Sequence, residues 1–337
     1  MKPPIKTGLL AFGLSGRIFH APFLDAHDRF ELTAVTERTT KEAHLTHPHL
    51  TSYDTVDDLI NDPTLDLIVI NTPNYTHFDY ARQALNAGKH LLVEKPFTVT
   101  TAQAEQLFTL AEQQNRHILP YQNRRYDSDY LSVKKIIDEG HLGRLVEAHF
   151  RFDRYRYTIS PKVAKETPVP GSGLLYDLGP HLLDAAISLF GTPLSWTKQL
   201  GHFRPQTQVD DYAHLHLTYP QEHQVFLTAS SLVPAIQPAF VLHGTQGSYI
   251  KHRADVQEQQ LLDGILPTDP IYGHEAYHHH GHLTTITPAG HKQTTTIPPI
   301  PTSYLHLFDA VYNTIQHNAP FPITPDDILT QLKILES

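Results

Sequence analysis

Residues Leu9 to Gly16 form an apolar strand that runs directly into a turn with glycines, Ala-Phe-Gly-Leu-Ser-Gly. An acidic residue, Glu37, follows about 20 positions later, as in dinucleotide-binding proteins. Glycines there let a pyrophosphate approach the main chain, the next helix offers free N–H groups, and the acid accepts hydrogen bonds from a ribose. The usual first glycine is replaced by Ala11. The predicted cofactor contacts of this region are Phe12, Gly13, Leu14, Ser15, Gly16, Glu37 and Arg38.

Two further segments place polar groups at the ends of predicted strands. Asn71-Thr72-Pro73 follows one apolar run, and Glu94-Lys95-Pro96 follows the next. Open parallel sheets bind ligands at this end of their strands. A lysine there can donate to a substrate oxygen and lower the pKa of a nearby hydroxyl group. For Asn71 to Pro73, ordinary turn formation is the alternative. The predicted cofactor contacts here are Asn71, Thr72, Pro73, His77, Glu94 and Lys95.

Asp177 and His181 are one helical turn apart, so they share a helix face. A carboxylate orients an imidazole and stabilises its protonated form, and an imidazole is a competent base for an alcohol proton. Asp184 is expected to support His181 from the other side. The alternative is that Asp177 caps the helix and His181 is incidental.

The order of predicted elements changes near residue 122. Before it, strands at 5–12, 30–36, 65–71, 89–94 and 117–121 alternate with helices, which predicts an α/β Rossmann domain with a doubly wound parallel sheet. After it, alternating polar and apolar residues predict strands at 146–153, 215–219, 224–230, 239–242 and 248–251, with helices at 127–139, 178–190, 303–316 and 326–335. We expect residues 1–121 to bind the cofactor. Residues 122–337 should form an α+β domain with an open, mostly antiparallel sheet that binds substrate, its last helix packing back on the first domain.

Composition excludes several protein classes. The net charge of −9 disfavours a nucleic-acid-binding surface. The absence of cysteine excludes disulfides and thiolate metal sites. No run approaches the roughly 20 apolar residues of a membrane helix, and the first residues lack the apolar core of a signal peptide. The sequence therefore predicts a cytoplasmic protein without membrane or nucleic-acid partners.

Histidine is unusually frequent, with 25 residues. The run His278-His279-His280-Gly281-His282 raises the alternative of a metal-dependent enzyme. Adjacent residues of an extended segment point in opposite directions, so a solvated loop is favoured and no metal is expected.

These motifs together resemble the Gfo/Idh/MocA family of NAD(P)-dependent sugar and polyol dehydrogenases. The resemblance spans nearly the whole chain and is carried by Ala11 to Gly16, Glu94-Lys95-Pro96, Gln122 to Asp127, and Asp177-x-Gly-x-His181. It is closest to the scyllo-inositol dehydrogenase-like branch. The resemblance implies a catalytic set of Lys95, Asp177 and His181. It also implies a second domain that contacts substrate and other subunits, in a homodimer or homotetramer.

The expected reaction is hydride transfer between a secondary alcohol of a sugar or cyclic polyol and NAD or NADP. His181 would accept the hydroxyl proton, Lys95 would stabilise the alkoxide, and Asp177 would support the imidazolium. Glu37 favours NAD and Arg38 favours NADP, with a slight lean to NAD. The alternative is a catalytically inactive nucleotide-binding regulatory protein, which we expect to have lost the lysine or the histidine. The predicted substrate contacts are Asn123, Arg125, Tyr157, Asp177 and His181.

Overall fold

The computed structural model describes residues 3–159, 166–276 and 279–337. This part of the chain divides into two compact units. Unit 1 comprises Met1–Asn123, Gln257–Tyr272 and Ser303–Leu332, and unit 2 comprises Arg124–Val256, Gly273–Thr302 and Lys333–Ser337. Cofactor binding by residues 1–121 and substrate binding by residues 122–337 stay predictions.

Unit 1 is built on a parallel sheet, sheet A, with the strand order β3-β2-β1-β4-β5-β6. This order confirms the predicted doubly wound sheet, because the chain builds outward from β1 in one direction and then from β4 in the other. Its strands are β1 (Ile5–Leu9), β2 (Phe30–Thr36), β3 (Thr51–Tyr53), β4 (Leu67–Ile70), β5 (His90–Val93) and β6 (Ile118–Pro120).

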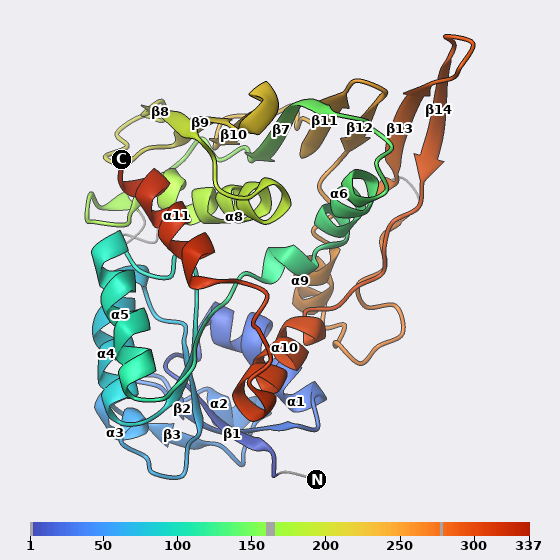
Figure 1. Ribbon diagram of the computed structural model, residues 1–337. Coiled ribbons are helices and arrows are strands. Elements are labelled where there is room, and N and C mark those ends of the chain that lie inside the picture. The colour runs from blue at the N-terminus through green and yellow to red at the C-terminus, as the bar shows by residue number, and fades with distance from the viewer. Residues whose placement is uncertain (1–2, 160–165, 277–278) are drawn as a thin grey trace. The chain divides into compact units, whose positions relative to one another are not determined.

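Helices cover sheet A, and Figure 1 shows α4 beside α5, and α1 beside α10. The unit 1 helices are α1 (Ala21–Ala26), α2 (Ala43–Thr46), α3 (Val56–Ile60), α4 (His77–Asn86), α5 (Thr101–Gln113), most of α9 (Val256–Leu262), α10 (Leu305–His317) and most of α11 (Pro325–Glu336). Thr100 caps α5, because its side chain accepts the N–H of Gln103 at 3.2 Å. Phe308 of α10 stacks on Phe23 of α1 at 5.7 Å between ring centroids.

His90 of β5 gives unit 1 a predicted sensitivity to acid. Burial, then the charges of His117 and Arg116, lower the pKa of His90 to about 4 from 6.5, and its Nδ1 accepts the N–H of His117 at 3.0 Å. As the pH falls, His90 therefore takes up its proton at a higher pH in the unfolded chain than in the folded protein. As pH falls from 6.5 to 4, the free energy of unfolding should drop by up to about 3 kcal/mol.

The variant His90→Asn tests this, because the asparagine oxygen keeps an acceptor near Nδ1 but does not titrate. Thermal unfolding between pH 7.5 and 4.5 should show a smaller loss of stability in the variant than in the wild type. Parallel curves for the two proteins would contradict the prediction.

Unit 2 is built on a second sheet, sheet B, with the order β14-β13-β12-β11-β7-β10-β9-β8. Neighbours pair antiparallel except β7 and β10, which are parallel because α8, β8 and β9 lie between them in the chain. The predicted, mostly antiparallel sheet is thus confirmed. Its strands are β7 (Leu145–Asp153), β8 (Ser195–Gly201), β9 (Tyr212–Thr218), β10 (Gln224–Ser230), β11 (Phe240–Gly244), β12 (Gly247–Lys251), β13 (Gly281–Ile286) and β14 (Lys292–Ile297).

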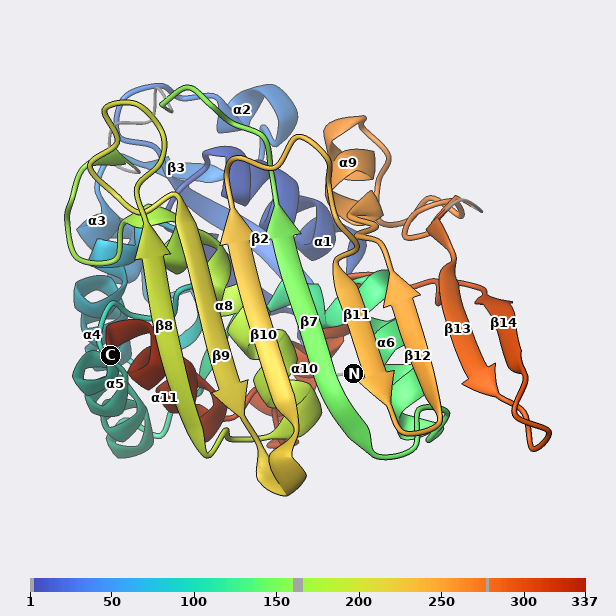
Figure 2. The ribbon, with the colours of Figure 1, turned by 90° about the horizontal axis from the view of Figure 1, so that it is seen from above.

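Helices α6 (Ser128–Asp138) and α8 (Gly173–Phe190) pack on one face of sheet B, behind the strands in Figure 2. The strands alternate accordingly. In β9, Ala213, Leu215 and Leu217 are buried, whereas the residues between them are half-exposed. Strands β8, β13 and β14 were not predicted. Residues 292–297 are polar and largely exposed, so no apolar pattern marks β14.

Helix α8 begins at Gly173, five residues before the predicted start at 178, and continues through Pro180. The prediction was wrong because a distant residue provides the cap. Asp210 accepts the N–H of Leu175 at 2.6 Å through its carboxylate and that of Leu174 at 2.9 Å through its carbonyl. Gly173 has φ +87°, and a Cβ there would lie 2.0 Å from the Asp210 carboxylate.

In the described ranges, none of the helices combines the length and apolar character needed to cross a membrane.

Candidate active site

The turn after β1 is accessible to a ligand. Gly13 and Leu14 are exposed, and no atom lies within 4 Å of the position a Cβ would take on Gly13. A π-helical turn, η1 (Gly16–His20), then leads into α1. At Gly16 a Cβ would lie 2.4 Å from the carbonyl oxygen of Ala11, so a side chain does not fit. Phe12 is buried beneath the turn. An open main chain ahead of a helical segment suits the predicted pyrophosphate contact.

Asn71, at the end of β4, holds this turn in place. Its side-chain oxygen accepts the N–H of Ala11 at 2.9 Å, and its amide nitrogen donates to the carbonyl of Ala11 at 2.8 Å. Both bonds use only the main chain of Ala11, so they do not depend on the side chain at this position. Thr72 is half-buried and Pro73 is exposed.

The carboxylate of Glu37 is already occupied by protein donors. Its Oε1 accepts the N–H groups of Glu42 and Ala43 at 2.7 and 2.9 Å, and its Oε2 accepts the hydroxyl of Ser52 at 2.7 Å. Burial alone raises the pKa of Glu37, but these hydrogen bonds and the charge of Lys41 outweigh it and lower the pKa. Arg38 is exposed. Glu37 therefore fixes the segment between β2 and β3.

His77 is buried at the start of α4, where it joins two strand ends. Its ring nitrogens lie 2.9 Å from the carbonyl oxygens of Pro96 and Thr72. Burial lowers the pKa of His77, although the two carbonyls act against it. The observed contacts position the backbone after β4 and β5, and direct cofactor contact by His77 stays a prediction.

Lys95 is half-buried directly after β5, as predicted, and its peptide bond to Pro96 is cis. The preceding Glu94 accepts the hydroxyl of Ser15 at 2.7 Å, and His20 lies 2.9 Å away through Nε2. Thus unit 1 brings the glycine turn and the Glu94-Lys95-Pro96 segment into direct contact. His20 was not predicted, because nothing in its local sequence separates it from the many other histidines.

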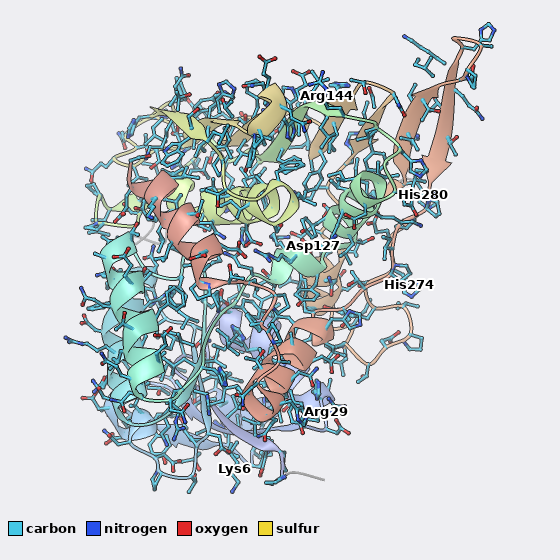
Figure 3. The ribbon with its side chains drawn as sticks, viewed as in Figure 1. Lys6, Arg29, Asp127, Arg144, His274 and His280 are labelled. Atoms are coloured by element: carbon cyan, nitrogen blue, oxygen red, sulfur yellow. The ribbon has the colours of Figure 1, made fainter. Side chains whose placement is uncertain are left out.

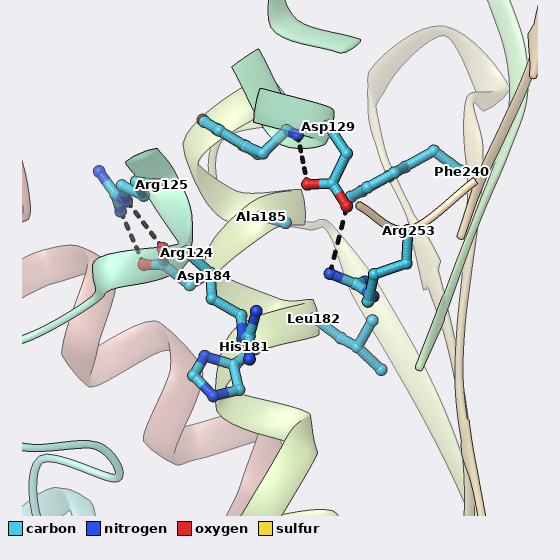
Figure 4. Close-up of a pocket in the computed structure, with 10 residues that line it drawn as sticks. Arg124, Arg125, Asp129, His181, Leu182, Asp184, Ala185, Phe240 and Arg253 are labelled. Carbon is cyan, nitrogen blue, oxygen red and sulfur yellow. Dashed lines mark hydrogen bonds and ion pairs between the residues drawn. The ribbon is translucent and has the colours of Figure 1, made fainter. Parts of the chain in front are cut away.

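Unit 2 places Asp177 and His181 one turn apart on α8, as predicted. Both are half-buried, and His181 lines a cavity together with Arg124, Arg125 and Arg253. Figure 4 shows the side chain of His181 beside that of Arg124. Asp177 forms an ion pair with Arg154 at 3.5 Å.

The aromatic ring of Phe152 organises this cavity. The guanidinium groups of Arg253, Arg154 and Arg124 lie 4.3, 5.0 and 5.2 Å from its centroid. His181 stacks on the same ring at 6.2 Å. Apart from Arg125, these arginines were not predicted from the sequence, because the fold brings them together from distant positions: Arg154 follows β7, Arg253 follows β12 and Arg124 precedes α6.

Each cavity arginine lies against at least one carboxylate. Arg125 makes a bidentate pair with Asp184 at 2.8 and 2.9 Å, so Asp184 holds Arg125. Arg253 lies 3.6 Å from Asp129. Arg124 pairs with Asp127 and Asp255 at 2.9 and 2.7 Å.

The remaining predicted substrate contacts differ in exposure. Asn123 is buried in unit 1, and Tyr157 is 54% exposed in unit 2. Their predicted contacts with substrate stay predictions.

The histidine run is not simply a loop. His282 lies in β13, and His280, labelled in Figure 3, directly precedes that strand. His278 lies outside the described residues. Among the residues with described positions, no group of three or more histidine, aspartate or glutamate side chains is arranged to hold a metal ion.

Known proteins resemble both parts of the chain. Residues 5–122 match the model of the oxidoreductase family with an NAD-binding Rossmann fold, and residues 130–250 match the GFO/IDH/MocA C-terminal domain. An uncharacterized oxidoreductase of Schizosaccharomyces pombe, C115.03, is 38% identical over 99% of this chain and 96% of its own. The scyllo-inositol 2-dehydrogenase (NADP(+)) IolW of Bacillus subtilis is 34% identical over 99% of this chain and 92% of its own.

A solved structure extends the likeness to three dimensions. An oxidoreductase from Bacillus cereus is 31% identical with a TM-score of 0.91, over 98% of this chain and 95% of its own. The dinucleotide turn, the lysine after β5 and the aspartate–histidine pair of α8 thus occur in a chain that matches both family domains. This protein belongs to the Gfo/Idh/MocA family of NAD(P)-dependent oxidoreductases.

Proposed function

We propose that this enzyme transfers a hydride between a secondary alcohol of a neutral cyclic polyol or sugar and NADP. The observation that carries the substrate class is the pairing of each cavity arginine with an aspartate around His181. Paired guanidinium and carboxylate groups offer donors and acceptors without a free positive charge, which suits hydroxyl groups better than an anionic group. The name of the IolW relative supports an inositol-like substrate.

In this proposal, His181 accepts the hydroxyl proton and Asp177 stabilises the resulting imidazolium. Lys95 donates to the oxygen on which negative charge develops. The glycine turn and the segments at Asn71 and Glu94 would hold the dinucleotide. When bound, the nicotinamide supplies the hydride acceptor.

Two features of unit 1 support NADP over NAD. The Glu37 carboxylate already accepts three hydrogen bonds from the protein, which leaves little capacity for ribose hydroxyls. Arg38 is exposed beside it and can pair with a 2′-phosphate. NADP therefore replaces NAD, the cofactor favoured from the sequence.

Cofactor choice is tested by thermal unfolding with NADPH and NADH in parallel. Ligand at 100 times its Kd adds about 2.7 kcal/mol of stability. Arg38→Ala should weaken NADPH binding about tenfold, because one charge-assisted contact is lost, and leave NADH binding unchanged. Arg82→Ala, an exposed arginine of α4, is the matched control. Tighter binding of NADH than NADPH by the wild type would overturn the preference.

Substrate class is tested by following NADPH formation with scyllo-inositol, other cyclic polyols and free sugars, and with a uronate as the anionic comparison. We expect turnover with a neutral polyol and a lower kcat/KM for the uronate. Binding of NADPH without turnover of any alcohol would favour the regulatory alternative.

A further inference from the structure

The carboxylate of Glu94 has two donors, one within the glycine turn Ala11 to Gly16 and one in the helical segment that follows it. Ser15 Oγ donates to Glu94 Oε1 at 2.7 Å, and His20 Nε2 lies 2.9 Å from the same oxygen. The His20 side chain is 0% exposed and that of Glu94 is 14% exposed. Because Lys95 directly follows Glu94, this cluster connects the turn to the proposed catalytic lysine.

The ring of His20 has a fixed position. It lies 4.6 Å from the ring of Tyr121 and 6.4 Å from that of Phe308. Tyr121 is itself held, because its hydroxyl donates to the carbonyl of Phe19 at 2.9 Å. The π-helical turn Gly16–His20 carries His20, and such turns occur often at functional sites.

We propose that His20 is a positioning residue for hydride transfer, which together with Ser15 holds Glu94 and thereby couples the dinucleotide turn to Lys95. The inference rests on the proposed function. Its direct consequence is that loosening Glu94 weakens both cofactor binding and the placement of Lys95.

The effect of His20 on cofactor binding should depend on pH, because Glu94 titrates. Burial raises the pKa of Glu94, but His20, then Ser15 and the charge of Lys95, outweigh it and lower the pKa. The charge of Glu94 also acts on His77, whose pKa it raises against the larger effect of burial. Without the donor on His20, burial is less opposed, so the pKa of Glu94 rises. Glu94 then takes up a proton at a higher pH and loses its hold on Ser15.

The test compares His20→Phe with His20→Gln. Phenylalanine keeps the ring but removes the donor, whereas the glutamine amide reaches the position of Nε2. The primary readout is NADPH affinity, measured by fluorescence titration from pH 5.5 to 8.5. At pH 6, His20→Phe should bind NADPH about tenfold more weakly than the wild type, because one charge-assisted hydrogen bond to Glu94 is lost. His20→Gln should stay within about threefold, a small fraction of that change in free energy.

His27→Phe is the matched control, since His27 is also buried in unit 1 and also faces a carboxylate, Asp309, at 3.2 Å. It should bind NADPH as the wild type does. If His20→Phe does not fold, Ser15→Ala is tested in its place, and its NADPH affinity should show the same loss at acid pH.

Two results would overturn the proposal. One is a wild-type pH profile of NADPH affinity in His20→Phe or Ser15→Ala. The other is an equal loss in His20→Phe and His20→Gln, which indicates packing alone. Because binding is the readout, a wild type that binds NADPH but turns over no alcohol contradicts the proposed reaction and leaves this test intact. Where turnover is found, the acid limb of kcat should move to higher pH in His20→Phe and return in His20→Gln.

Discussion

Replacing His181 with glutamine is expected to lower kcat by about 10²- to 10⁴-fold, the usual contribution of a general base. Glutamine retains hydrogen-bonding capacity but cannot accept a proton at neutral pH. His181 is half-buried in its cavity and stacks on Phe152, so the substitution removes proton transfer with little change in volume. The measurement is steady-state kinetics with the best polyol found. NADPH affinity should remain unchanged, because the proposed dinucleotide contacts are the glycine turn and the segments at Asn71 and Glu94, and they do not include His181.

His149→Gln is a matched control that distinguishes the loss of a catalytic base from a general disturbance of the structure by a histidine-to-glutamine substitution. His149 of β7 also lies in unit 2 and also stacks on a phenylalanine, Phe226, at 4.8 Å. His149→Gln should keep kcat within about twofold, a free-energy difference below that of a single tenfold step. Asp177→Asn should lower kcat less than His181→Gln does, since the aspartate acts through the imidazole. A His181→Gln enzyme with more than a tenth of wild-type kcat would remove His181 from the role of base.

Replacing Lys251 with methionine is expected to destabilise unit 2 by about 3–5 kcal/mol. Lys251 and Glu275 are both fully buried, with Nζ 2.5 Å from Oε2, and Lys251 also donates to the carbonyl of His279. The methionine fills the space but leaves the carboxylate buried without its counter-charge. Urea unfolding followed through Trp196 measures the effect, because the single tryptophan of the chain lies in β8.

The pH dependence of this loss has a definite sign. Burial raises the pKa of Glu275, and Lys251 acts against it. Without Lys251 the pKa rises further, so the folded state binds a proton that the unfolded state releases, and stability falls as pH rises. The cost of Lys251→Met should therefore be smaller at pH 5 than at pH 8. The double variant Lys251→Met/Glu275→Met should recover most of the stability. A double variant as unstable as the single one would assign the loss to packing.

Most strands of unit 1 could be predicted from local sequence patterns. Apolar and polar residues alternate from Phe30 to Ala34, and the observed β2 has the predicted bounds. The apolar runs of β4 and β5 are buried along their length, as parallel strands covered on both faces must be. The glycine turn depends on neighbours only a few residues away. For that reason it could be predicted from the sequence.

Elements that depend on distant partners were not predicted. Helix α8 starts at Gly173 because Asp210 caps it by accepting the N–H of Leu175, 35 residues earlier in the chain. Strand β14 is polar and pairs through its backbone with β13, so its side chains carry no signal.

The candidate site also has a part that was predicted from the sequence and a part that was not. Residue types and spacing by themselves indicated the dinucleotide turn, Lys95 and the Asp177–His181 pair, because each lies within one element or turn. Only the tertiary structure decided that the Glu37 carboxylate already accepts three hydrogen bonds from the protein, that Asp184 holds Arg125, and that His20 reaches Glu94. Hydrogen bonds and ion pairs depend on distances of about 3 Å between residues far apart in the chain. No local pattern specifies such distances, so the fold alone sets which charges meet.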